Sequence, residues 1–214
     1  DEKVISNFVK AFIKNKNELI ITSQALLCGK KLNETEDFFV NTKEALEINQ
    51  LTAFEQYKKM SFSCFYASGA TAYKSEIIKQ MGLFDERYKL VEDWSYYLKC
   101  TRNNIKIIYE DFITLKHRMG GVSHNAKKTI SPTTKKYYMD IINIFETEVL
   151  PYLNQFKTKE KYQIINRYIN HAKKYKKEIP NLYKTKILVK IKLIFQNFDI
   201  FFDFFKFLNS FFSV

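Results

Sequence analysis

One pair of adjacent carboxylates is a candidate for acid–base chemistry. Glu92 and Asp93 precede Trp94 and open a segment, residues 93–103, with the apolar periodicity of an amphipathic helix. Asp93 would lie at or next to the helix N-terminus, where a carboxylate can accept hydrogen bonds from backbone N–H groups as an N-cap. The same carboxylate at the rim of a cleft would serve as a general base. Helix signals alone favour the cap.

Two further polar residues close a predicted strand. His117 and Arg118 are followed by Gly120 and Gly121, and the backbone freedom of such glycines is typical of loops that approach ligands. Arg118 could bind a phosphate with two hydrogen bonds, or it could be a surface residue at a strand end. His117 is a candidate metal ligand, although a lone histidine is more often structural.

The elements that must position these residues alternate between helix and strand. Helices are predicted at residues 3–15, 50–59, 75–81 and 93–103, and strands at residues 18–28, 61–66, 105–109 and 112–118. Residues 29–37 are predicted to be a loop, residues 68–70 a tight turn, and Gly82 the end of a helix. This mixed order predicts an α/β fold, a mixed sheet with flanking helices.

The pattern changes after Pro132. Residues 133–150, 158–178 and 182–212 have helical spacing throughout and no strand signal. We therefore place a boundary near residue 130, with an α/β part at residues 1–130 and an all-α C-terminal extension at residues 131–214. The extension is basic, because residues 151–214 hold thirteen of the 35 Lys and Arg but only four of the 23 Asp and Glu.

Composition narrows the class of protein. Hydrophobic residues make up 46% of the chain, which is enough for a core, and the five Gly and three Pro are too few for a turn-rich all-β protein. The three cysteines are widely spaced and form no C-x-x-C pair, which argues against a zinc site or a disulfide framework and fits a reducing cytoplasm. Neither a signal-peptide pattern nor an uncharged apolar stretch of about 18 residues is present in the sequence.

Four short segments occur in an order that resembles one known family. They are Ser68-Gly69-Ala70, Gly82-Leu83-Phe84-Asp85-Glu86, Glu92-Asp93-Trp94 and His117-Arg118-x-Gly-Gly-x-Ser123. Together they resemble the second half of the inverting glycosyltransferases of family 2, which have the GT-A fold. The resemblance covers about residues 1–125. It implies a partial GT-A fold and the inverting transfer of a sugar from a nucleotide-sugar donor to a glycan or lipid-linked acceptor.

The resemblance also implies roles for the residues around the carboxylate pair. Asp93 would be the general base that deprotonates the acceptor hydroxyl. Glu92 would shape the pocket or bind acceptor hydroxyls. Trp94 would present an apolar face to the acceptor sugar, with a role in the core as the alternative.

Three more positions match the family pattern, and one motif does not occur. Ser68 and Gly69 would lie beside the donor sugar and the acceptor, and Arg118 near the donor diphosphate. The family's front half carries an Asp-x-Asp motif that holds Mg²⁺ or Mn²⁺, and no Asp-x-Asp occurs in these 214 residues. We therefore expect this chain to be a fragment that begins just after that motif and that is inactive alone.

Residues 157–214 are basic and aromatic, which suits an anionic membrane surface. The alternatives are that these helices pack on the catalytic domain or form a homo-oligomer, while nucleic acid is a third option for which no motif is present. The expected protein is a bacterial glycosyltransferase of polysaccharide assembly, cytoplasmic and peripheral at the inner face of the cell membrane. The rival is a non-catalytic oligomerisation or membrane-docking module built on a GT-A remnant.

Overall fold

The computed structural model describes residues 2–29, 32, 35–118 and 132–174. The chain divides into two compact units, Asp1–Glu148 and Val149–Val214. The helix that follows residue 131 therefore groups with the first unit, whereas the sequence pattern placed the boundary near residue 130. The predicted helix at residues 182–212 lies outside the described residues.

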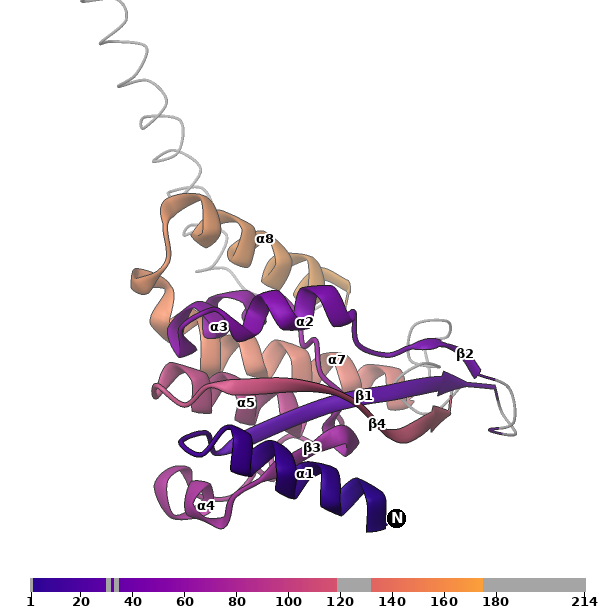
Figure 1. Cartoon of the computed structure of the whole chain (residues 1–214). Helices are drawn as coiled ribbons and strands as arrows, with labels where there is room; N and C mark the ends of the chain where they lie inside the picture. Colours follow the sequence, from indigo (N-terminus) through magenta and orange to yellow (C-terminus); the bar gives the residue numbers. More distant parts are fainter. Residues whose placement is uncertain (1, 30–31, 33–34, 119–131, 175–214) are drawn as a thin grey trace, which may run out of the picture. The chain divides into compact units, whose positions relative to one another are not determined.

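A mixed sheet forms the centre of the first unit. Its strands are β1 (Ile20–Cys28), β2 (Thr35–Phe38), β3 (Thr71–Tyr73) and β4 (Ile107–Arg118). The long strand β1 pairs in parallel with β4 along its length, and it pairs antiparallel with β3 near its start and with β2 near its end. Figure 1 shows β1 and β4 running side by side between the helices. The α/β fold class with a mixed sheet is thus confirmed.

The helices of the first unit are α1 (Glu2–Lys14), α2 (Thr42–Asn49), α3 (Ala53–Met60), α4 (Ser75–Met81), α5 (Glu92–Arg102) and α7 (Pro132–Ile144). A short 3-10 turn, η1, spans Ser68–Ala70. Beyond α7 the chain continues through a π turn at Phe145–Val149 and a 3-10 turn at Leu150–Gln155, and the second unit contains α8 (Thr158–Lys174). The predicted end of α4 is confirmed, because Gly82 has φ of 74°, a conformation that favours glycine.

The outer edge of β4 is covered by two side-chain amides. Asn49, at the end of α2, donates to the Tyr109 carbonyl at 2.8 Å and accepts from the Tyr109 N–H at 2.8 Å. Gln56, in α3, makes the same pair of bonds with Ile107, at 2.9 Å each. These amides take the place of a neighbouring strand, so the start of β4 does not offer unpaired backbone groups to another chain.

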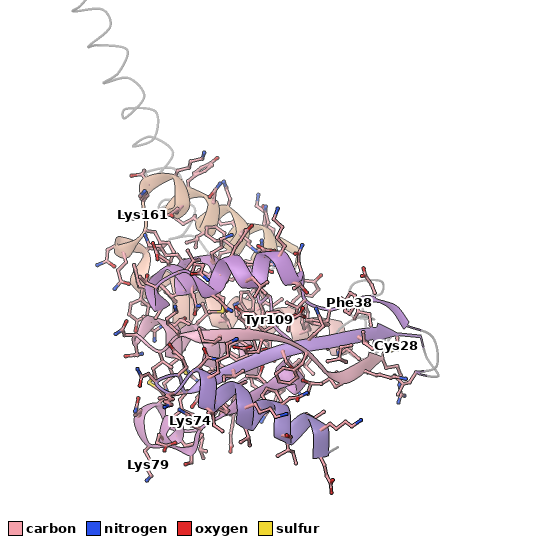
Figure 2. All side chains as sticks on the ribbon, in the orientation of Figure 1. Cys28, Phe38, Lys74, Lys79, Tyr109 and Lys161 are labelled. Atoms are coloured by element: carbon pink, nitrogen blue, oxygen red, sulfur yellow. The ribbon has the colours of Figure 1, made fainter. Side chains whose placement is uncertain are left out.

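The middle of β1 is polar although it is fully buried. Gln24 donates to the Val40 carbonyl at 2.8 Å, accepts from the Val40 N–H at 2.9 Å and donates to the hydroxyl of Tyr109, a residue labelled in Figure 2. Ser23 donates to the Ala70 carbonyl at 3.2 Å. Buried polar groups need such partners, and here they fix the chain before α2 and the turn η1 against the sheet.

Several local predictions differ from the structure. Residues 61–66 are not a strand: Ser61 donates to the Tyr57 carbonyl at 2.9 Å and so continues the end of α3. The predicted loop at residues 29–37 includes the start of β2, and α2 and β3 had not been predicted. The two strands predicted at residues 105–118 are one strand, β4, whose register with β1 shifts on either side of Gln24.

Candidate active site

The segment that leads into α5 is fixed from α7. The buried carboxylate of Asp140 accepts hydrogen bonds from the backbone N–H of Lys89 at 2.8 Å and of Leu90 at 3.0 Å. Tyr88, just before them, hydrogen-bonds through its hydroxyl to Thr147 at 2.5 Å. The start of α5, which carries the Glu92-Asp93 pair, therefore has a defined position.

Asp93 is the second residue of α5 and is not its cap. The N-cap position belongs to Val91, whose side chain makes no cap hydrogen bond. Burial raises the pKa of Asp93 to about 6, while the backbone N–H of Trp94 acts in the opposite direction and the adjacent Glu92 charge adds to the rise. Asp93 is thus not the N-cap residue that helix signals favoured, although its half-buried carboxylate interacts with the backbone N–H of Trp94 in the first turn of α5.

Asp93 interacts electrostatically with side chains from two other segments and with one from its own helix. Its charge raises the pKa of Cys64, Tyr73 and Tyr97, in each case in addition to a larger effect of burial. These three groups are therefore protonated near neutral pH. Tyr97 also hydrogen-bonds to Thr71 at 2.8 Å, and Thr71 follows η1 directly. The structure thereby ties the helix that carries Asp93 to the turn that contains Ser68 and Gly69.

The turn η1 lies close to the sheet. Ser68 and Gly69 are exposed, whereas Ala70 is buried with Ala25 and Ala67. A Cβ atom on Gly69 would lie 2.7 Å from Leu115 Cδ2 of β4. The glycine permits this close approach, since a larger residue would require the Leu115 side chain to move.

Trp94 belongs to the core. It is 5% exposed, its indole Nε1 donates to the Met60 carbonyl at 2.8 Å, and its ring packs edge-on against Phe145. Of the two roles that the sequence allowed, the structure gives contacts only for packing. This corrects the expectation that Trp94 offers an apolar face to an acceptor.

The remaining predicted site residues lie in two parts of the structure: Glu92 at the start of α5, and His117 and Arg118 at the end of β4. Glu92 is half-buried at the first position of α5, beside Asp93. His117 and Arg118 pair with Leu27 and Cys28 at the ends of β4 and β1, and the His117 ring packs edge-on against Phe39 at 5.2 Å. Arg118 is exposed, and within the described residues no hydrogen bond or ion pair joins it to Asp93 or to η1.

A cavity of about 310 Å³ connects several of these neighbours; we call it the α2 cavity. Its lining residues come from the start of α2, the chain before it and the chain before η1: Phe39, Val40, Asn41, Glu44, Ala45, Cys64 and Phe65. Phe39 also contacts His117 and the alanine cluster under η1. Cys64, which lines the cavity, also interacts electrostatically with Asp93.

Tyr66 carries an unsatisfied polar group beside this cavity. The residue is 2% exposed, and its hydroxyl has no hydrogen-bond partner in the structure. Burial raises the pKa of Tyr66, with smaller contributions from Cys64 and Glu44, which both line the α2 cavity. A buried hydroxyl without a partner is rare and often belongs to a functional site.

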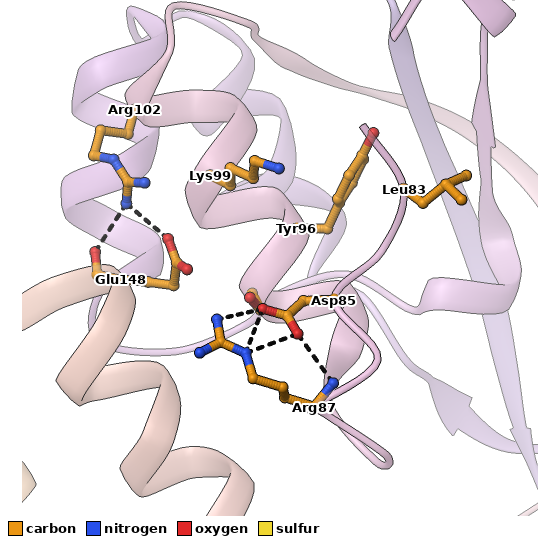
Figure 3. Close-up of a pocket in the computed structure, with 8 residues that line it drawn as sticks. Leu83, Asp85, Arg87, Tyr96, Lys99, Arg102 and Glu148 are labelled. Carbon is orange, nitrogen blue, oxygen red and sulfur yellow. Dashed lines mark hydrogen bonds and ion pairs between the residues drawn. The ribbon is translucent and has the colours of Figure 1, made fainter. Parts of the chain in front are cut away.

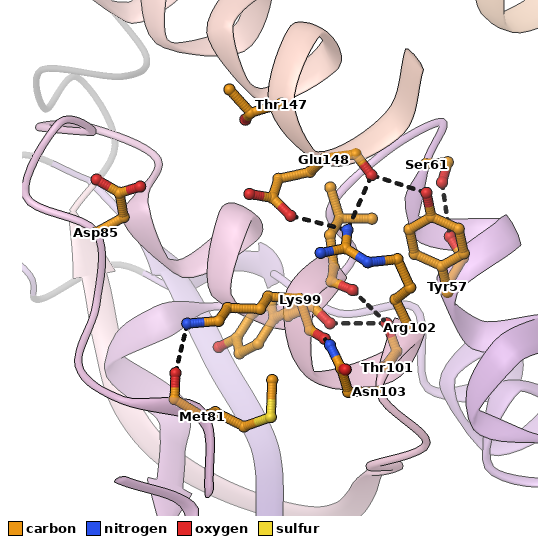
Figure 4. A network of polar contacts seen from close by, with 12 residues as sticks. Tyr57, Ser61, Met81, Asp85, Lys99, Thr101, Arg102, Asn103, Thr147 and Glu148 are labelled. Atoms are coloured by element: carbon orange, nitrogen blue, oxygen red, sulfur yellow. Dashed lines mark hydrogen bonds and ion pairs between the residues drawn. The ribbon is translucent and has the colours of Figure 1, made fainter. Parts of the chain in front are cut away.

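A second cavity, of about 190 Å³, lies on the opposite face of α5; we call it the α5 cavity (Figure 3). Its charged groups are largely matched by neighbours. Arg87 contacts Asp85 at 2.5 Å, and Arg102 contacts Glu148 at 2.8 Å. Lys99 donates to the Met81 carbonyl, as Figure 4 shows.

The network around the α5 cavity fixes α5 to its surroundings. Tyr57 donates to the Glu148 carbonyl at 2.7 Å, and Arg102 donates to both the carbonyl and the carboxylate of Glu148 (Figure 4). Tyr96 donates to the Gly82 carbonyl at 2.9 Å. These contacts join α3, the end of α4 and the π turn after α7 to one helix, so this face of α5 serves to position the other.

In the part of the chain that the structure describes, no group of three or more His, Cys, Asp or Glu side chains could hold a metal ion. No family model matches the chain, and no curated protein or solved structure matches it. The function therefore has to be argued from the site alone.

Sequence reasoning missed the lining of the α2 cavity. Phe39 and Glu44 lie in residues 38–49, which were left unassigned, and Cys64 and Phe65 lie in residues 61–66, which were predicted to be a strand. Glu44 lies in the first turn of α2, after Asn41, whose side chain accepts from the Glu44 N–H at 3.1 Å. That Asn-x-x-Glu spacing is a helix-start signal that could have located α2.

Proposed function

We propose that this chain is the acceptor-side part of a nucleotide-sugar-dependent glycosyltransferase in which Asp93 is the general base. One observation carries the proposal: a half-buried carboxylate with a pKa of about 6 lies at the start of a well-anchored helix, which a hydrogen bond from Tyr97 to Thr71 ties to the end of an exposed small-residue turn. A base with a pKa near the working pH combines a large ionised fraction with a useful affinity for the proton.

The proposed step is an inverting displacement. Asp93 accepts the proton of an acceptor hydroxyl while the hydroxyl oxygen forms a bond to the anomeric carbon of the donor sugar. The bond from that carbon to the nucleotide diphosphate breaks, and the diphosphate leaves with the electron pair. Burial, with a smaller contribution from the Glu92 charge, keeps the pKa of Asp93 raised, and the interacting Tyr73 and Tyr97 side chains are protonated near neutral pH.

The supporting residues keep the roles that the family resemblance implies. Glu92 would bind acceptor hydroxyls, Ser68 and Gly69 would contact the sugars, and Arg118 would bind the diphosphate. A bound Mg²⁺ or Mn²⁺ ion would neutralise the leaving diphosphate. The described residues offer no metal site, so its ligands, and most of the donor contacts, would come from a nucleotide-binding half outside residues 1–214.

The place of action is proposed to be the inner face of the cell membrane. Among the described residues, no helix is long and apolar enough to cross a membrane. Helix α8 has strong amphipathic periodicity and several basic residues, and it begins the basic segment 157–214. Such a segment suits an anionic lipid surface. If residues 1–214 instead sediment as a stable oligomer and ignore anionic liposomes, this segment is an assembly element.

Substitution of Asp93 tests the catalytic proposal. In a polypeptide that carries these residues together with the nucleotide-binding half, Asp93→Asn is expected to lower kcat by a factor of about 10²–10⁴, the usual contribution of a general base. The exposed carboxylate of Glu86, changed by Glu86→Gln, is the matched control and should leave kcat unchanged. Turnover within about threefold of the wild type in Asp93→Asn would show that Asp93 is not the base.

The pH profile gives an independent readout. The base must be deprotonated, so the rate should rise with pH through about 6 and level off above it. Residues 1–214 alone should transfer no sugar, because the donor would lack its binding half. Robust transfer by residues 1–214 would contradict this division of the enzyme.

A further inference from the structure

We propose that the outer side of α1 docks on an anionic lipid surface, with Ile5, Val9 and Ile13 entering the bilayer interface between flanking lysines. This inference rests on the proposed place of action at a membrane. It adds a contact surface in the first unit, whereas the membrane contact expected from the sequence lies in residues 157–214.

Three branched aliphatic side chains form an exposed stripe on α1. Ile5, Val9 and Ile13 are 66%, 52% and 62% exposed. They are spaced four residues apart, so they lie one above another on the same side of the helix. The other large hydrophobic side chains that are exposed in the described part of the chain lie singly on different elements. A contiguous apolar patch of this kind commonly marks an interaction surface, whereas single exposed residues do not.

The stripe is not what holds α1 on the sheet. Ala11 is buried on another side of the helix, and the Phe8 ring packs edge-on against Phe112 of β4 at 5.0 Å. Just beyond the helix, Asn15 donates to the Glu110 carboxylate of β4 at 2.8 Å. Figure 1 shows α1 along one side of the strands and α2 and α3 along the other. The apolar surface of α1 is therefore wider than its packing on the sheet requires.

Lysines lie on both sides of the stripe. Lys3 and Lys10 are exposed and seven residues apart, which places them together on the polar side of α1. Phe12 is seven residues after Ile5 and so borders the stripe on its other side, where the Lys74 ammonium lies 5.3 Å from the centre of the Phe12 ring. Figure 2 labels Lys74 near the end of α1. Such lysines can lay their aliphatic stems on apolar surface and keep their charges at the level of lipid headgroups.

The charge of this surface favours a lipid over a protein partner. The described charged residues on α1 and beside its end are mostly basic: Glu2, Lys3, Lys10, Lys14, Lys16 and Lys74. Of these, Lys14 is paired with Glu110 of β4 at 2.9 Å. Lysine is depleted in the interfaces between proteins. An apolar helix surface bordered by lysines is instead the usual composition of a helix that lies in an anionic membrane interface.

A second copy of this chain fits the surface less well. In a two-fold interface both copies use the same patch, so the lysines beside each stripe would approach the lysines of the other copy. Three aliphatic side chains also supply little of the roughly 800 Å² per partner that a stable interface buries. A lipid surface has neither requirement, because each side chain enters it separately and each lysine meets its own headgroup.

Co-sedimentation of residues 1–214 with liposomes tests the inference. The vesicles contain phosphatidylcholine alone or a mixture with phosphatidylglycerol, and residues 1–214 should bind the mixed vesicles. Ile5→Gln, Val9→Gln and Ile13→Gln, combined in one variant, should weaken this binding about tenfold or more, because three aliphatic side chains no longer leave water. Glutamine is a good helix former, so α1 should remain helical, which circular dichroism checks.

Two matched controls separate the stripe from general hydrophobicity and general charge. Leu46→Gln with Leu83→Gln removes exposed apolar side chains outside α1 and should leave binding unchanged. Lys3→Gln with Lys10→Gln should weaken binding to the mixed vesicles about fivefold or more. Lys43→Gln with Lys59→Gln makes the same change of charge on α2 and α3 and should have little effect.

The outcomes distinguish this inference from the proposed function. If the α1 variant binds mixed vesicles like the wild type, the inference is wrong, the contact belongs to residues 157–214 and the place of action stands. If wild-type residues 1–214 ignore the mixed vesicles, the inference and the place of action both fail. Neither result bears on the role of Asp93, which the turnover of Asp93→Asn decides.

The nucleotide-binding half of the proposed enzyme is the alternative cover for the stripe. Thermal unfolding of the polypeptide that includes this half, without lipid, separates the two. A stripe that waits for lipid is exposed to water, so the variant with three glutamines should keep Tm within about 2 °C of the wild type. A fall of many degrees would mean that the stripe is buried against protein and would overturn the inference. A dimer of residues 1–214 that the same substitutions dissociate in sedimentation velocity would overturn it as well.

Discussion

The two faces of α5 differ in how their polar groups are satisfied. On the face with Tyr96, Lys99 and Arg102, ion pairs and carbonyl hydrogen bonds match the charges to neighbours. On the face with Asp93 and Tyr97, a half-buried carboxylate has a raised pKa, and the hydroxyl of Tyr66, whose ring packs against Tyr97, has no hydrogen-bond partner among the described residues. One face is built for stability, whereas the other retains groups that cost stability.

This difference between the two faces is an argument for where the proposed site lies, and it does not depend on a similar protein. Structural charges are expected to be paired, and perturbed or unpaired groups concentrate at functional sites. Both faces contain titratable residues, so charge alone does not separate them. The two faces are separated by whether their polar groups are paired with neighbours. Substitutions on the two faces should therefore change stability in opposite directions.

The largest expected change in stability should follow from removing the buried ion pair between Arg102 and Glu148, on the face of α5 that carries Tyr96 and Lys99. The side chains of Arg102 and Glu148 are only 14% and 11% exposed. Arg102→Ala leaves the Glu148 carboxylate buried without its partner, which is expected to lower the free energy of unfolding by about 3–5 kcal/mol. Urea denaturation measures the loss.

Arg87→Ala is the matched control for this prediction. Arg87 also pairs with a carboxylate, that of Asp85, but its side chain is 68% exposed. Exposed pairs contribute about 0–1 kcal/mol, so this variant should be close to the wild type. Equal losses in both variants would show that burial does not distinguish the two ion pairs.

The next largest change in stability should be an increase, caused by the substitution of Asp93. Asp93 has a folded-state pKa of about 6, above its ordinary value of 3.8. The folded state therefore holds the proton more tightly than the unfolded state, and wild-type stability falls as pH rises from about 4 to about 6. Asp93→Asn removes this cost, so it should raise the unfolding free energy by about 3 kcal/mol at pH 7.5.

The same pair of proteins supplies the control at low pH. At pH 4 the folded wild type carries a neutral Asp93, and the advantage of Asp93→Asn should disappear. Urea denaturation of both proteins across this pH range measures the difference. A stability gap that is independent of pH would mean that Asp93 does not titrate near 6, and the contrast between the two faces would then lose its main support.

Local patterns predicted the positions of the chemical groups better than their environments. The start of α5, the glycine end of α4 and the small-residue turn at Ser68–Ala70 depend on residues close in sequence, and all three are confirmed. The pKa of Asp93 is raised by burial, and its carboxylate interacts with Cys64 and Tyr73, which two other segments provide. No local pattern contains that information.

The incorrect predictions have the same origin, because they too depend on contacts between residues that are distant in the sequence. Residues 61–66 alternate in a strand-like way, but Ser61 completes α3, and Trp94 from α5 takes the hydrogen bond of the Met60 carbonyl. Trp94 itself looked available for a ligand because its position beside Asp93 says nothing about Met60 or Phe145. The α2 cavity, similarly, exists only because Gln24 of β1 fixes Val40.

The smallest expected effect concerns the close approach of η1 to the sheet. In Gly69→Ala the new Cβ atom would lie 2.7 Å from Leu115 Cδ2, the end of a flexible side chain that has to move. We expect a loss of about 1 kcal/mol, at the lower end of the cost of overpacking. In a Leu115→Val background that terminal carbon is absent, so the same change at Gly69 should cost little. An equal cost in both backgrounds would place the strain in the backbone of the turn, and Gly69 would then be required by conformation rather than by its contact with β4.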